Sequence, residues 1–462
     1  MYLWIKKSIG KTYSYLKPEI RWAPEFNKII TLLLESENWS KDKLDEFQYE
    51  KTKAILKHAE KNVPWYKKKF AEWGVHSCIF KEISDIKKFP CVTKEEMRDN
   101  LSQFLSNEAK TNKLKYVTTG GSTGIPFGFY QSRAVLNIES AFFSYHWGWY
   151  GCRHQIDKSV VLRGSFVGDE QNLFSYSPRT NEWHFSTYYL TEKNFDKYFN
   201  KLNSIKPKFI QAYPSAAELF AKYMLSYNKT LDFHPEAIMC GSENLYQVQK
   251  DIIEKAFQTK IHCWYGQAEK VCLAPWTKNS QLYHILPQYG LIELVDNSGK
   301  ELNKENEIGE IIATSFYNFD MPFIRYKSMD MATFSNQISP DYPNYKIFSK
   351  INGRLQELFI TGNGRLISMT AINMHDNIFD ELRQFQFYQD TPGELIMNVI
   401  PKGDLSDSAI SNIRNKMINK LGSDVKLEIR IVENIPKTKS GKLRFLIQKI
   451  PINHSGIIES VE

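Results

Sequence analysis

The feature that most limits how this chain can fold is a regular alternation of apolar strands and amphipathic helices across its middle third. Strands are expected at residues 160–163, 208–212, 237–240 and 260–264, with helices between them at 194–202, 215–225 and 245–257. These strands are mainly apolar instead of alternating, which is typical of parallel strands that helices cover on both faces. We therefore expect an α/β fold, with ligands bound beyond the carboxyl ends of the strands.

The 462 residues exceed what one hydrophobic core holds, so more than one domain is expected. Residues 45–110 have the pattern of short helices, and Thr93 followed by Glu96 predicts a capped helix start. From residue 282 to 314, strands separated by glycine and charged turns indicate an antiparallel, barrel-like subdomain. Beyond residue 353 a strand, a helix and a strand indicate a small, mobile α+β domain. We predict a large domain over residues 1–355 and a small one over 356–462.

A loop rich in glycine, serine and threonine runs from Thr118 to Pro126, between two β-prone segments. Its glycines allow backbone N–H groups to turn inward and form an anion-binding nest, and its hydroxyl groups add further donors. It is not a Walker loop, because no Gly-Lys-Ser/Thr follows. An ordinary turn between two strands would have the same composition, so the loop alone does not decide the function.

Several further polar stretches follow predicted strands. Residues 241–243 and 265–269 each come after an apolar strand, and residues 325–330 place Asp330 in a turn. An aromatic ring there could face a purine, and the Glu269 carboxylate could hold Mg²⁺, although a solvated loop carboxylate would look the same. Residues 435–444 form a cationic loop that could equally be an exposed basic tail.

Composition excludes several classes of function. A formal charge of +8 without a long basic run does not indicate a nucleic-acid groove. The six cysteines show no metal-binding spacing, which favours reduced thiols in the cytoplasm. No apolar run has the length of a membrane helix. Lysines interrupt residues 1–22, which therefore do not have the pattern of a signal peptide.

Taken in order, these stretches resemble the motifs of the adenylate-forming superfamily, which includes acyl-CoA synthetases and luciferases. Within it the chain is similar to the phenylacetate–CoA ligase branch, and there to the adenylating proteins of capsular-polysaccharide biosynthesis. The resemblance covers nearly the whole chain. Its motifs match the phosphate loop at 119–126, Tyr-Gly-x-x-Glu at 265–269, the ribose motif at 326–330, Gly-Arg at 353–354 and Pro-x-Thr-x-Ser-Gly-Lys at 436–442; two N-terminal segments, 62–66 and 89–94, match as well.

The resemblance also implies roles for residues at the matching positions. The loop would bind the phosphates of ATP through Thr119, Gly121, Ser122, Thr123 and Gly124. The adenine pocket would be lined by Gly241, Ser242, Glu243 and Tyr265, and Gly266 and Gln267 would also bind the cofactor. Glu269 would act in catalysis by holding Mg²⁺, and Asp330 and Arg354 would bind the ribose. Lys442 would be the catalytic lysine that meets the acid carboxylate and the α-phosphate.

The chain departs from the family pattern at three positions. The loop lysine is Ile125 here, which removes one phosphate contact, the glycine of the ribose motif is Met329, and the usual charged hinge residue is Gln356. The acid pocket is expected at the ends of two strands, with Arg163, Tyr213 and Ser215 as its residues. The pattern does not name the acid.

The resemblance implies an ATP-dependent, AMP-forming ligase of the cytoplasm that activates a carboxylic acid as an acyl-adenylate. The acyl group would pass to CoA or to an amine or hydroxyl acceptor, which could belong to surface polysaccharide biosynthesis. The expected partners are these small molecules, and no nucleic acid is expected. No transmembrane segment is expected, and the protein would be a monomer or a homodimer. Two alternatives remain, an adenylyltransferase with a non-carboxylate acceptor and a nucleotide-binding protein without catalysis.

Overall fold

The computed structural model describes residues 24–118, 127–163, 166, 169–296, 298–354, 358–364, 366–368, 381–438, 443–450, 452–453 and 456–457. Contacts group the chain into two compact units, Met1–His154 with Trp264–Ile351 and Gln155–Cys263 with Asn352–Glu462. The predicted boundary between residues 355 and 356 lies outside the described residues. The division into domains 1–355 and 356–462 therefore stays a prediction.

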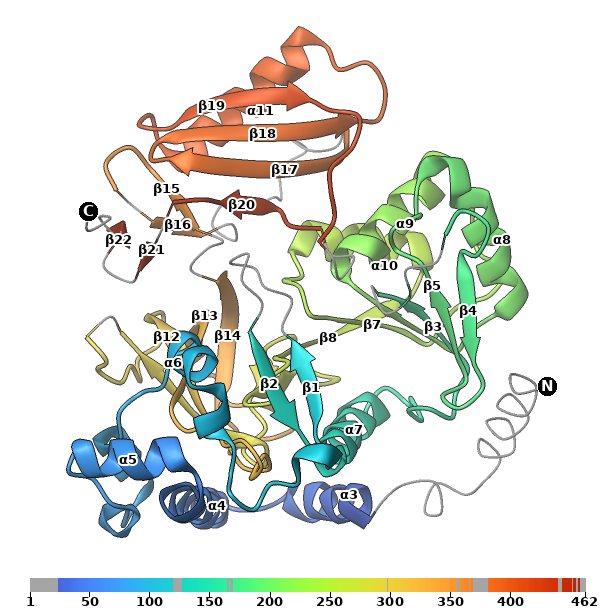
Figure 1. Ribbon diagram of the computed structural model, residues 1–462. Helices are drawn as coiled ribbons and strands as arrows, with labels where there is room; N and C mark the ends of the chain where they lie inside the picture. The colour runs from blue at the N-terminus through green and yellow to red at the C-terminus, as the bar shows by residue number, and fades with distance from the viewer. Residues whose placement is uncertain are drawn as a thin grey trace. The chain divides into compact units, whose positions relative to one another are not determined.

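Helices form the N-terminal part of the first unit (Figure 1). Ser40 caps α4 by accepting a hydrogen bond from the backbone N–H of Lys43, and Pro64 begins α5, where a missing N–H costs nothing. Thr93 and Glu96 form the predicted capping box at the start of α6. The α-helices are α3 (Pro24–Ser36), α4 (Lys41–Asn62), α5 (Pro64–Glu72), α6 (Lys94–Asp99) and α7 (Arg133–Gly148); the 3₁₀ helices are Ser77–Ile79, Ile83–Lys88, Leu101–Phe104 and Thr111–Lys113.

These helices pack on an antiparallel sheet, which confirms the antiparallel subdomain predicted from residue 282 onward. Its strands run in the order β10 (Tyr283–His284), β14 (Ile347–Arg354), β13 (Tyr326–Ser335), β12 (Ile308–Ser315) and β11 (Gly290–Val295). A separate hairpin of β1 (Lys115–Thr118) and β2 (Gly128–Gln131) flanks the glycine-rich loop, as predicted, and Thr118 pairs with Gly128. Phe89, Phe129 and Phe323 belong to the core of this unit.

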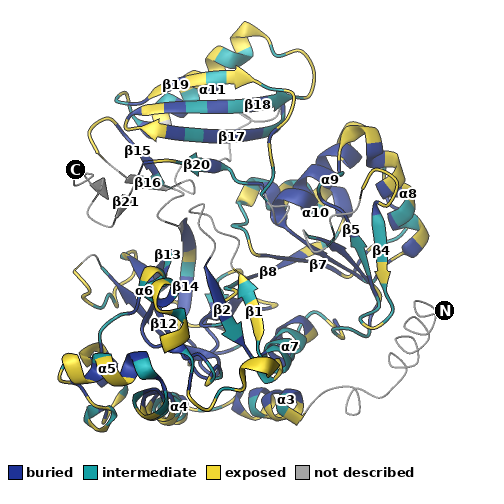
Figure 2. Cartoon of the chain, in the orientation of Figure 1, coloured by how far each residue is buried: buried dark blue, intermediate teal, exposed yellow. Residues whose placement is uncertain are grey.

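The second unit contains the predicted parallel sheet (Figure 2). Strand β3 pairs in parallel with β5 and β6, and β6 with β7. The strands β3, β6 and β7 are buried along their whole length, which explains why their sequences are mainly apolar and do not alternate. The order is β4 (Phe174–Ser177), β5 (Glu182–Phe185), β3 (Ser159–Leu162), β6 (Phe209–Ala212), β7 (Ala237–Gly241), β8 (Lys260–Gly266) and β9 (Leu273–Pro275); β8 continues into the first unit, where it pairs antiparallel with β9.

The helices of this sheet lie close to their predicted positions. They are α8 (Phe195–Ile205), α9 (Pro214–Ser226) and α10 (Gln247–Phe257), with a 3₁₀ turn at Glu192–Asn194 before α8. The antiparallel pair of β4 and β5 was not predicted, since both strands are short and only partly buried. The fold class, a parallel α/β sheet with an antiparallel subdomain and an α+β C-terminal part, is confirmed.

That C-terminal part is a sheet with one long helix. Its order is β19 (Lys426–Ile431), β18 (Glu394–Pro401), β17 (Leu382–Thr391) and β20 (Leu446–Gln448), and helix α11 (Asp407–Leu421) follows β18. Ile413, Met417 and Leu421 recur at helical spacing on α11 and are buried in the core of this sheet. Shorter strands are β15 (Leu358–Ile360), β16 (Leu366–Ser368), β21 (Ile452–Asn453) and β22 (Gly456–Ile457).

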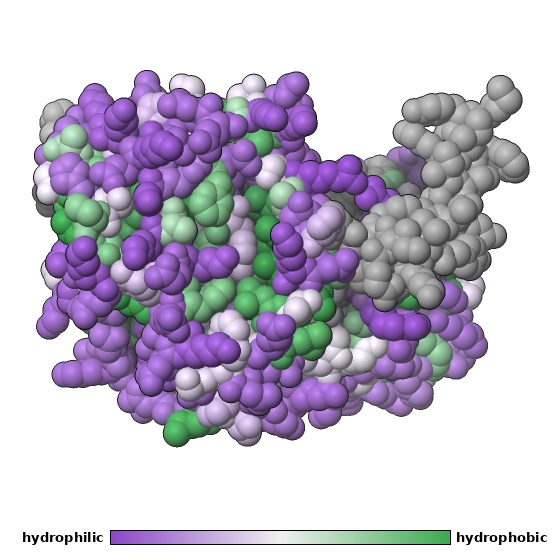
Figure 3. All heavy atoms as spheres, turned by 90° about the horizontal axis from the view of Figure 1, so that it is seen from below, coloured by the Kyte–Doolittle hydropathy of each residue, from purple (hydrophilic) through white to green (hydrophobic). Residues whose placement is uncertain are grey.

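The surface that carries α3, α4 and α5 is mostly hydrophilic. Figure 3 looks at this side and shows hydrophobic residues only in small groups between hydrophilic ones. Among the residues that the structure describes, no helix combines the length and the apolar character that crossing a membrane requires.

A buried histidine makes the stability of the second unit depend on pH. His262 on β8 is fully buried, and burial lowers its pKa from 6.5 to about 3. Below pH 6.5 this histidine binds a proton in the unfolded chain but stays neutral in the folded chain. The free energy of unfolding should therefore fall as the pH drops from 6.5 towards 3. The slope should approach about 1.4 kcal/mol per pH unit for this group. Urea unfolding at pH 7.5, 6 and 5 measures it, and His262→Leu should flatten the dependence. An equal slope in the variant would contradict the assignment.

Candidate functional site

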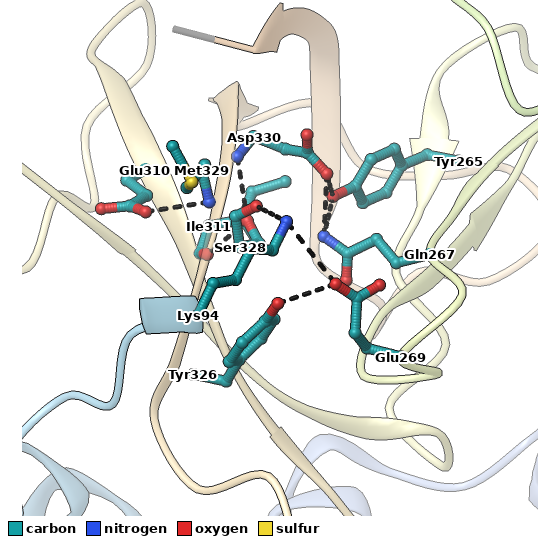
Figure 4. Close-up of polar contacts among 10 residues, drawn as sticks. All are labelled: Lys94, Tyr265, Gln267, Glu269, Glu310, Ile311, Tyr326, Ser328, Met329 and Asp330. Carbon is teal, nitrogen blue, oxygen red and sulfur yellow. Dashed lines mark hydrogen bonds and ion pairs between the residues drawn. The ribbon is translucent and has the colours of Figure 1, made fainter. Parts of the chain in front are cut away.

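The carboxyl end of β8 brings one group of predicted residues together in the first unit (Figure 4). The Tyr265 hydroxyl donates a hydrogen bond to Asp330 Oδ2 over 2.7 Å, and Gln267 Nε2 donates to the same oxygen over 2.9 Å. Gln267 also donates to the Tyr265 hydroxyl. Asp330 and Tyr265 are both buried, and the Gln267 side-chain oxygen is a buried acceptor without a hydrogen-bond donor among the described residues. The cluster therefore presents acceptors for a ligand that carries N–H or O–H groups.

A bulge in β13 aims Asp330 at this cluster. Glu310 of β12 pairs with Met331, whereas Ile312 pairs with Lys327, so one residue of β12 faces three of β13. Met329 in the bulge has a φ of 65°, and its N–H donates to the buried Glu310 carboxylate over 2.9 Å. This left-handed conformation is easiest for glycine, which is the residue that the family motif has at this position. Bulges re-aim side chains beside functional sites, and here the side chain is that of Asp330.

Glu269 lies in the same region and is held by two groups. Its Oε1 accepts a hydrogen bond of 2.7 Å from the Tyr326 hydroxyl and lies 3.5 Å from Lys94 Nζ. The Glu269 side chain is only 5% exposed and that of Lys94 15% exposed. Both contacts use Oε1, so among the described residues Oε2 accepts no hydrogen bond. This oxygen fits the predicted role toward Mg²⁺, which commonly takes one or two carboxylates beside phosphate oxygens.

A second group of predicted residues meets in the second unit, at the carboxyl ends of β3, β6 and β7. Arg163 Nη2 donates to Ser242 Oγ over 3.1 Å, and the guanidinium carbon lies 5.6 Å from the centre of the Tyr213 ring. The Ser215 backbone N–H and hydroxyl donate to the two oxygens of Glu243 over 3.0 and 3.1 Å. Glu243 thus binds the first turn of α9, where a carboxylate is stabilised by the helix dipole.

A lysine that the sequence did not single out lies beside this second group. Lys437 donates from Nζ to the carbonyl oxygen of Thr187. Burial lowers the pKa of Lys437 to about 8, although the neighbouring Glu243 carboxylate acts in the opposite direction. Arg163 and Lys437 thus lie near the Glu243 carboxylate, and the Glu182 carboxylate also acts on the pKa of Arg163.

Other predicted site residues lie outside the described residues. These are the loop positions Thr119, Gly121, Ser122, Thr123 and Gly124, the catalytic Lys442 and the hinge residue Gln356. The backbone of Arg354 ends β14, but its side chain is not described. Gly241 ends β7 and Gly266 ends β8, as predicted, so both turns follow strands of one sheet.

Lys94 and Tyr326 are the site residues that sequence reasoning missed in the first unit. The sequence places Lys94 in a capped helix start and at the end of the matching segment 89–94, and Tyr326 at the start of the ribose motif, without giving either residue a role. The capping box shows where α6 begins, so the sequence predicts that Lys94 is the first residue of this helix. It could not show which carboxylate lies opposite, because Glu269 is distant in the sequence.

The protein-family comparison identifies the C-terminal part of the chain. Residues 359–449 match the model described as the CapK C-terminal domain. Protein CapK of Staphylococcus aureus is 26% identical over 377 residues, which cover 80% of this chain and 81% of CapK. The phenylacetate–coenzyme A ligase of Aromatoleum evansii is 23% identical over 351 residues, which cover 70% of this chain and 73% of the ligase.

A solved structure of a CoA ligase has a fold similar to that of this chain. The 2-hydroxyisobutyryl-CoA ligase in its postadenylation state, in complex with 2-HIB-AMP, superposes with a TM-score of 0.69 at 18% identity, covering 87% of this chain and 89% of that one. At this identity the likeness concerns the fold. This chain therefore shares the fold of that CoA ligase.

Proposed function

We propose that this chain is an ATP-dependent, AMP-forming ligase of the adenylate-forming superfamily, because it is similar in sequence to CapK and to the phenylacetate–CoA ligases and in fold to a CoA ligase. It activates a carboxylic acid as an acyl-adenylate and releases pyrophosphate. The observation that carries this proposal is the cluster of Tyr265, Gln267 and Asp330 next to the buried Glu269. This group offers an aromatic ring, acceptors for hydroxyl groups and a carboxylate for a metal ion beside one another.

The chemistry needs little covalent help from the protein. The carboxylate oxygen of the acid attacks the α-phosphorus of ATP, the bond to the bridging oxygen breaks, and pyrophosphate leaves with the electron pair. Negative charge grows on the phosphoryl oxygens, so positioned cations and hydrogen-bond donors lower the barrier. We assign the ribose hydroxyls to Asp330, the metal to Glu269 and the developing charge to Lys442. Bound Mg²⁺ would supply charge neutralisation at the phosphates.

The acid pocket proposed is the group of Arg163, Tyr213 and Ser215 at the ends of β3 and β6, with Lys437 beside it. Arg163 and Lys437 would attract the carboxylate of the acid, and Tyr213 would provide an apolar wall. The acceptor of the acyl group is CoA, or an amine or hydroxyl group of a surface-polysaccharide precursor. The second acceptor class is proposed because the chain is similar to CapK over most of its length.

The decisive test is exchange of labelled pyrophosphate into ATP over a panel of carboxylic acids, with and without CoA. Exchange that requires one acid class supports the ligase, and release of AMP on addition of CoA identifies the acceptor. ATP binding without exchange, for every acid, would instead indicate a nucleotide-binding protein. Transfer of AMP to an acceptor that has no carboxylate would indicate an adenylyltransferase.

Glu269→Gln is expected to raise the Mg²⁺ concentration required for half-maximal exchange by about tenfold. The amide keeps the size of the side chain and a hydrogen bond with Tyr326 but loses the charge that a hard cation prefers. An Mg²⁺ titration of the exchange rate measures the change. Glu139→Gln is the matched control, since the Glu139 carboxylate also accepts a hydrogen bond from a tyrosine hydroxyl, that of Tyr289. An unchanged titration in Glu269→Gln would remove the metal role.

A further inference from the structure

Lys94 is placed in the candidate site by local structure. Thr93 caps α6, so Lys94 is the first residue of this helix, and its side chain extends to Ser328 and Glu269. Nζ donates to the Ser328 carbonyl oxygen over 3.3 Å and lies 3.5 Å from Glu269 Oε1. It also lies 6.0 Å from the centre of the Tyr326 ring. Figure 4 shows these groups converging beside Asp330 and Gln267.

A lysine in this position needs a reason, because desolvating an ammonium group is costly. The side chain is 15% exposed, and its carboxylate partner, 5% exposed, is itself shielded from water. An apolar pair would avoid both desolvation costs, so a buried ion pair of this kind is weak as a source of stability. Its location beside a predicted nucleotide site suggests a functional reason instead.

The glycine-rich loop has no cationic side chain that could bind the phosphates of ATP. Residues 119–126 contain no lysine, arginine or histidine, so the loop offers phosphates only amides and hydroxyl groups. A triphosphate carries several negative charges and is bound most strongly by charge-assisted hydrogen bonds. Beside the metal ion and Lys442, a cation from another part of the chain would strengthen this binding. Lys94 is beside the carboxylate that we assign to the metal.

We propose that Lys94 is a triphosphate-binding residue that supplies the positive charge absent from the glycine-rich loop. This inference rests on the proposed function. Without nucleotide, Glu269 and the Ser328 carbonyl hold the ammonium group in place. With ATP bound, the ammonium group binds phosphate oxygens, and Glu269 becomes available to the metal.

The test measures binding in the absence of any acid, so that no turnover is needed. Calorimetry gives the affinity for ATP, AMP and adenosine in wild type, Lys94→Met and Lys94→Arg, each checked for folding by circular dichroism. Lys94→Met should weaken ATP binding about tenfold or more, because one charge-assisted hydrogen bond is lost. Its affinity for adenosine should stay unchanged. Lys94→Arg should recover most of the ATP affinity.

Lys88→Met is the matched control. Lys88 precedes the same helix and pairs with Asp85 over 2.5 Å, but its side chain is 52% exposed, so the variant removes an equal charge away from the site. It should bind ATP like wild type. The inference is overturned if Lys94→Met binds ATP as wild type does, or if it loses ATP and adenosine affinity equally. If the wild type binds no ATP, the proposed function is wrong and the inference falls with it.

Discussion

Replacing Lys442 by alanine is expected to slow acyl-adenylate formation by ~10²-fold or more, the usual loss when a positioned group no longer meets developing charge. The residue lies within the stretch that matches the CapK C-terminal domain. Pyrophosphate exchange measures the adenylation step directly. Lys426→Ala is the control, since this lysine belongs to the same part of the chain and its side chain is 83% exposed.

The second half-reaction separates a catalytic lysine from a structural one. Transfer from a supplied acyl-adenylate does not involve attack on the α-phosphorus, so Lys442→Ala should retain it. Pyrophosphate exchange at the wild-type rate in this variant would show that Lys442 has no catalytic role and only belongs to a basic loop. A variant that loses both half-reactions together would indicate that the substitution disturbs folding.

The largest expected effect on stability concerns Arg325. Its guanidinium donates to both oxygens of Glu293, over 2.8 and 3.0 Å, and to the carbonyl oxygens of Lys87 and Phe89. Both side chains of the pair are about 5% exposed. Arg325→Met should lower the free energy of unfolding by about 3–5 kcal/mol, because it leaves the Glu293 carboxylate buried and unpaired.

A double variant tests that explanation. Burial already raises the pKa of Glu293 although Arg325 counteracts it, so the lone carboxylate should be less stable in its charged form. Arg325→Met combined with Glu293→Leu should therefore be more stable than Arg325→Met alone, as urea unfolding would show. Losses that simply add would mean that the hydrogen bonds to Lys87 and Phe89 carry the effect instead.

Most of the fold could be predicted because its signals are local. The buried strand at 237–241 is a continuous apolar run and that at 209–212 is apolar except for Gln211, and α9 and α10 show helical periodicity close to the observed bounds. The hairpin of β4 and β5 escaped prediction because its strands are four residues each, and neither is continuously apolar. Short strands at the edge of a sheet gain their conformation from pairing, which the sequence does not display.

The residues of the site could be predicted in part, but their contacts with one another could not. Tyr265, Gln267 and Asp330 were each found as members of motifs, and the structure joins them by hydrogen bonds. Lys94 belongs to a recognisable cap, yet its partner is Glu269, far along the chain. A motif gives the type of a residue, whereas the identity of its neighbour depends on how distant elements pack. The position of Lys437 could not be predicted for the same reason, since its hydrogen-bond partner Thr187 is far from it in the sequence.

The bulge in β13 bears on how easily this activity could be gained or lost in evolution. The three bulge residues Ser328, Met329 and Asp330 lie opposite the single residue Ile311. The excess is two residues, and side chains alternate with a period of two, so the same faces stay buried on either side of the bulge. Removing Met329 and Asp330 would leave one residue opposite Ile311 and would take away the carboxylate that we assign to the ribose. The proposed ribose contact could therefore be lost in evolution while β12 and β13 stay paired.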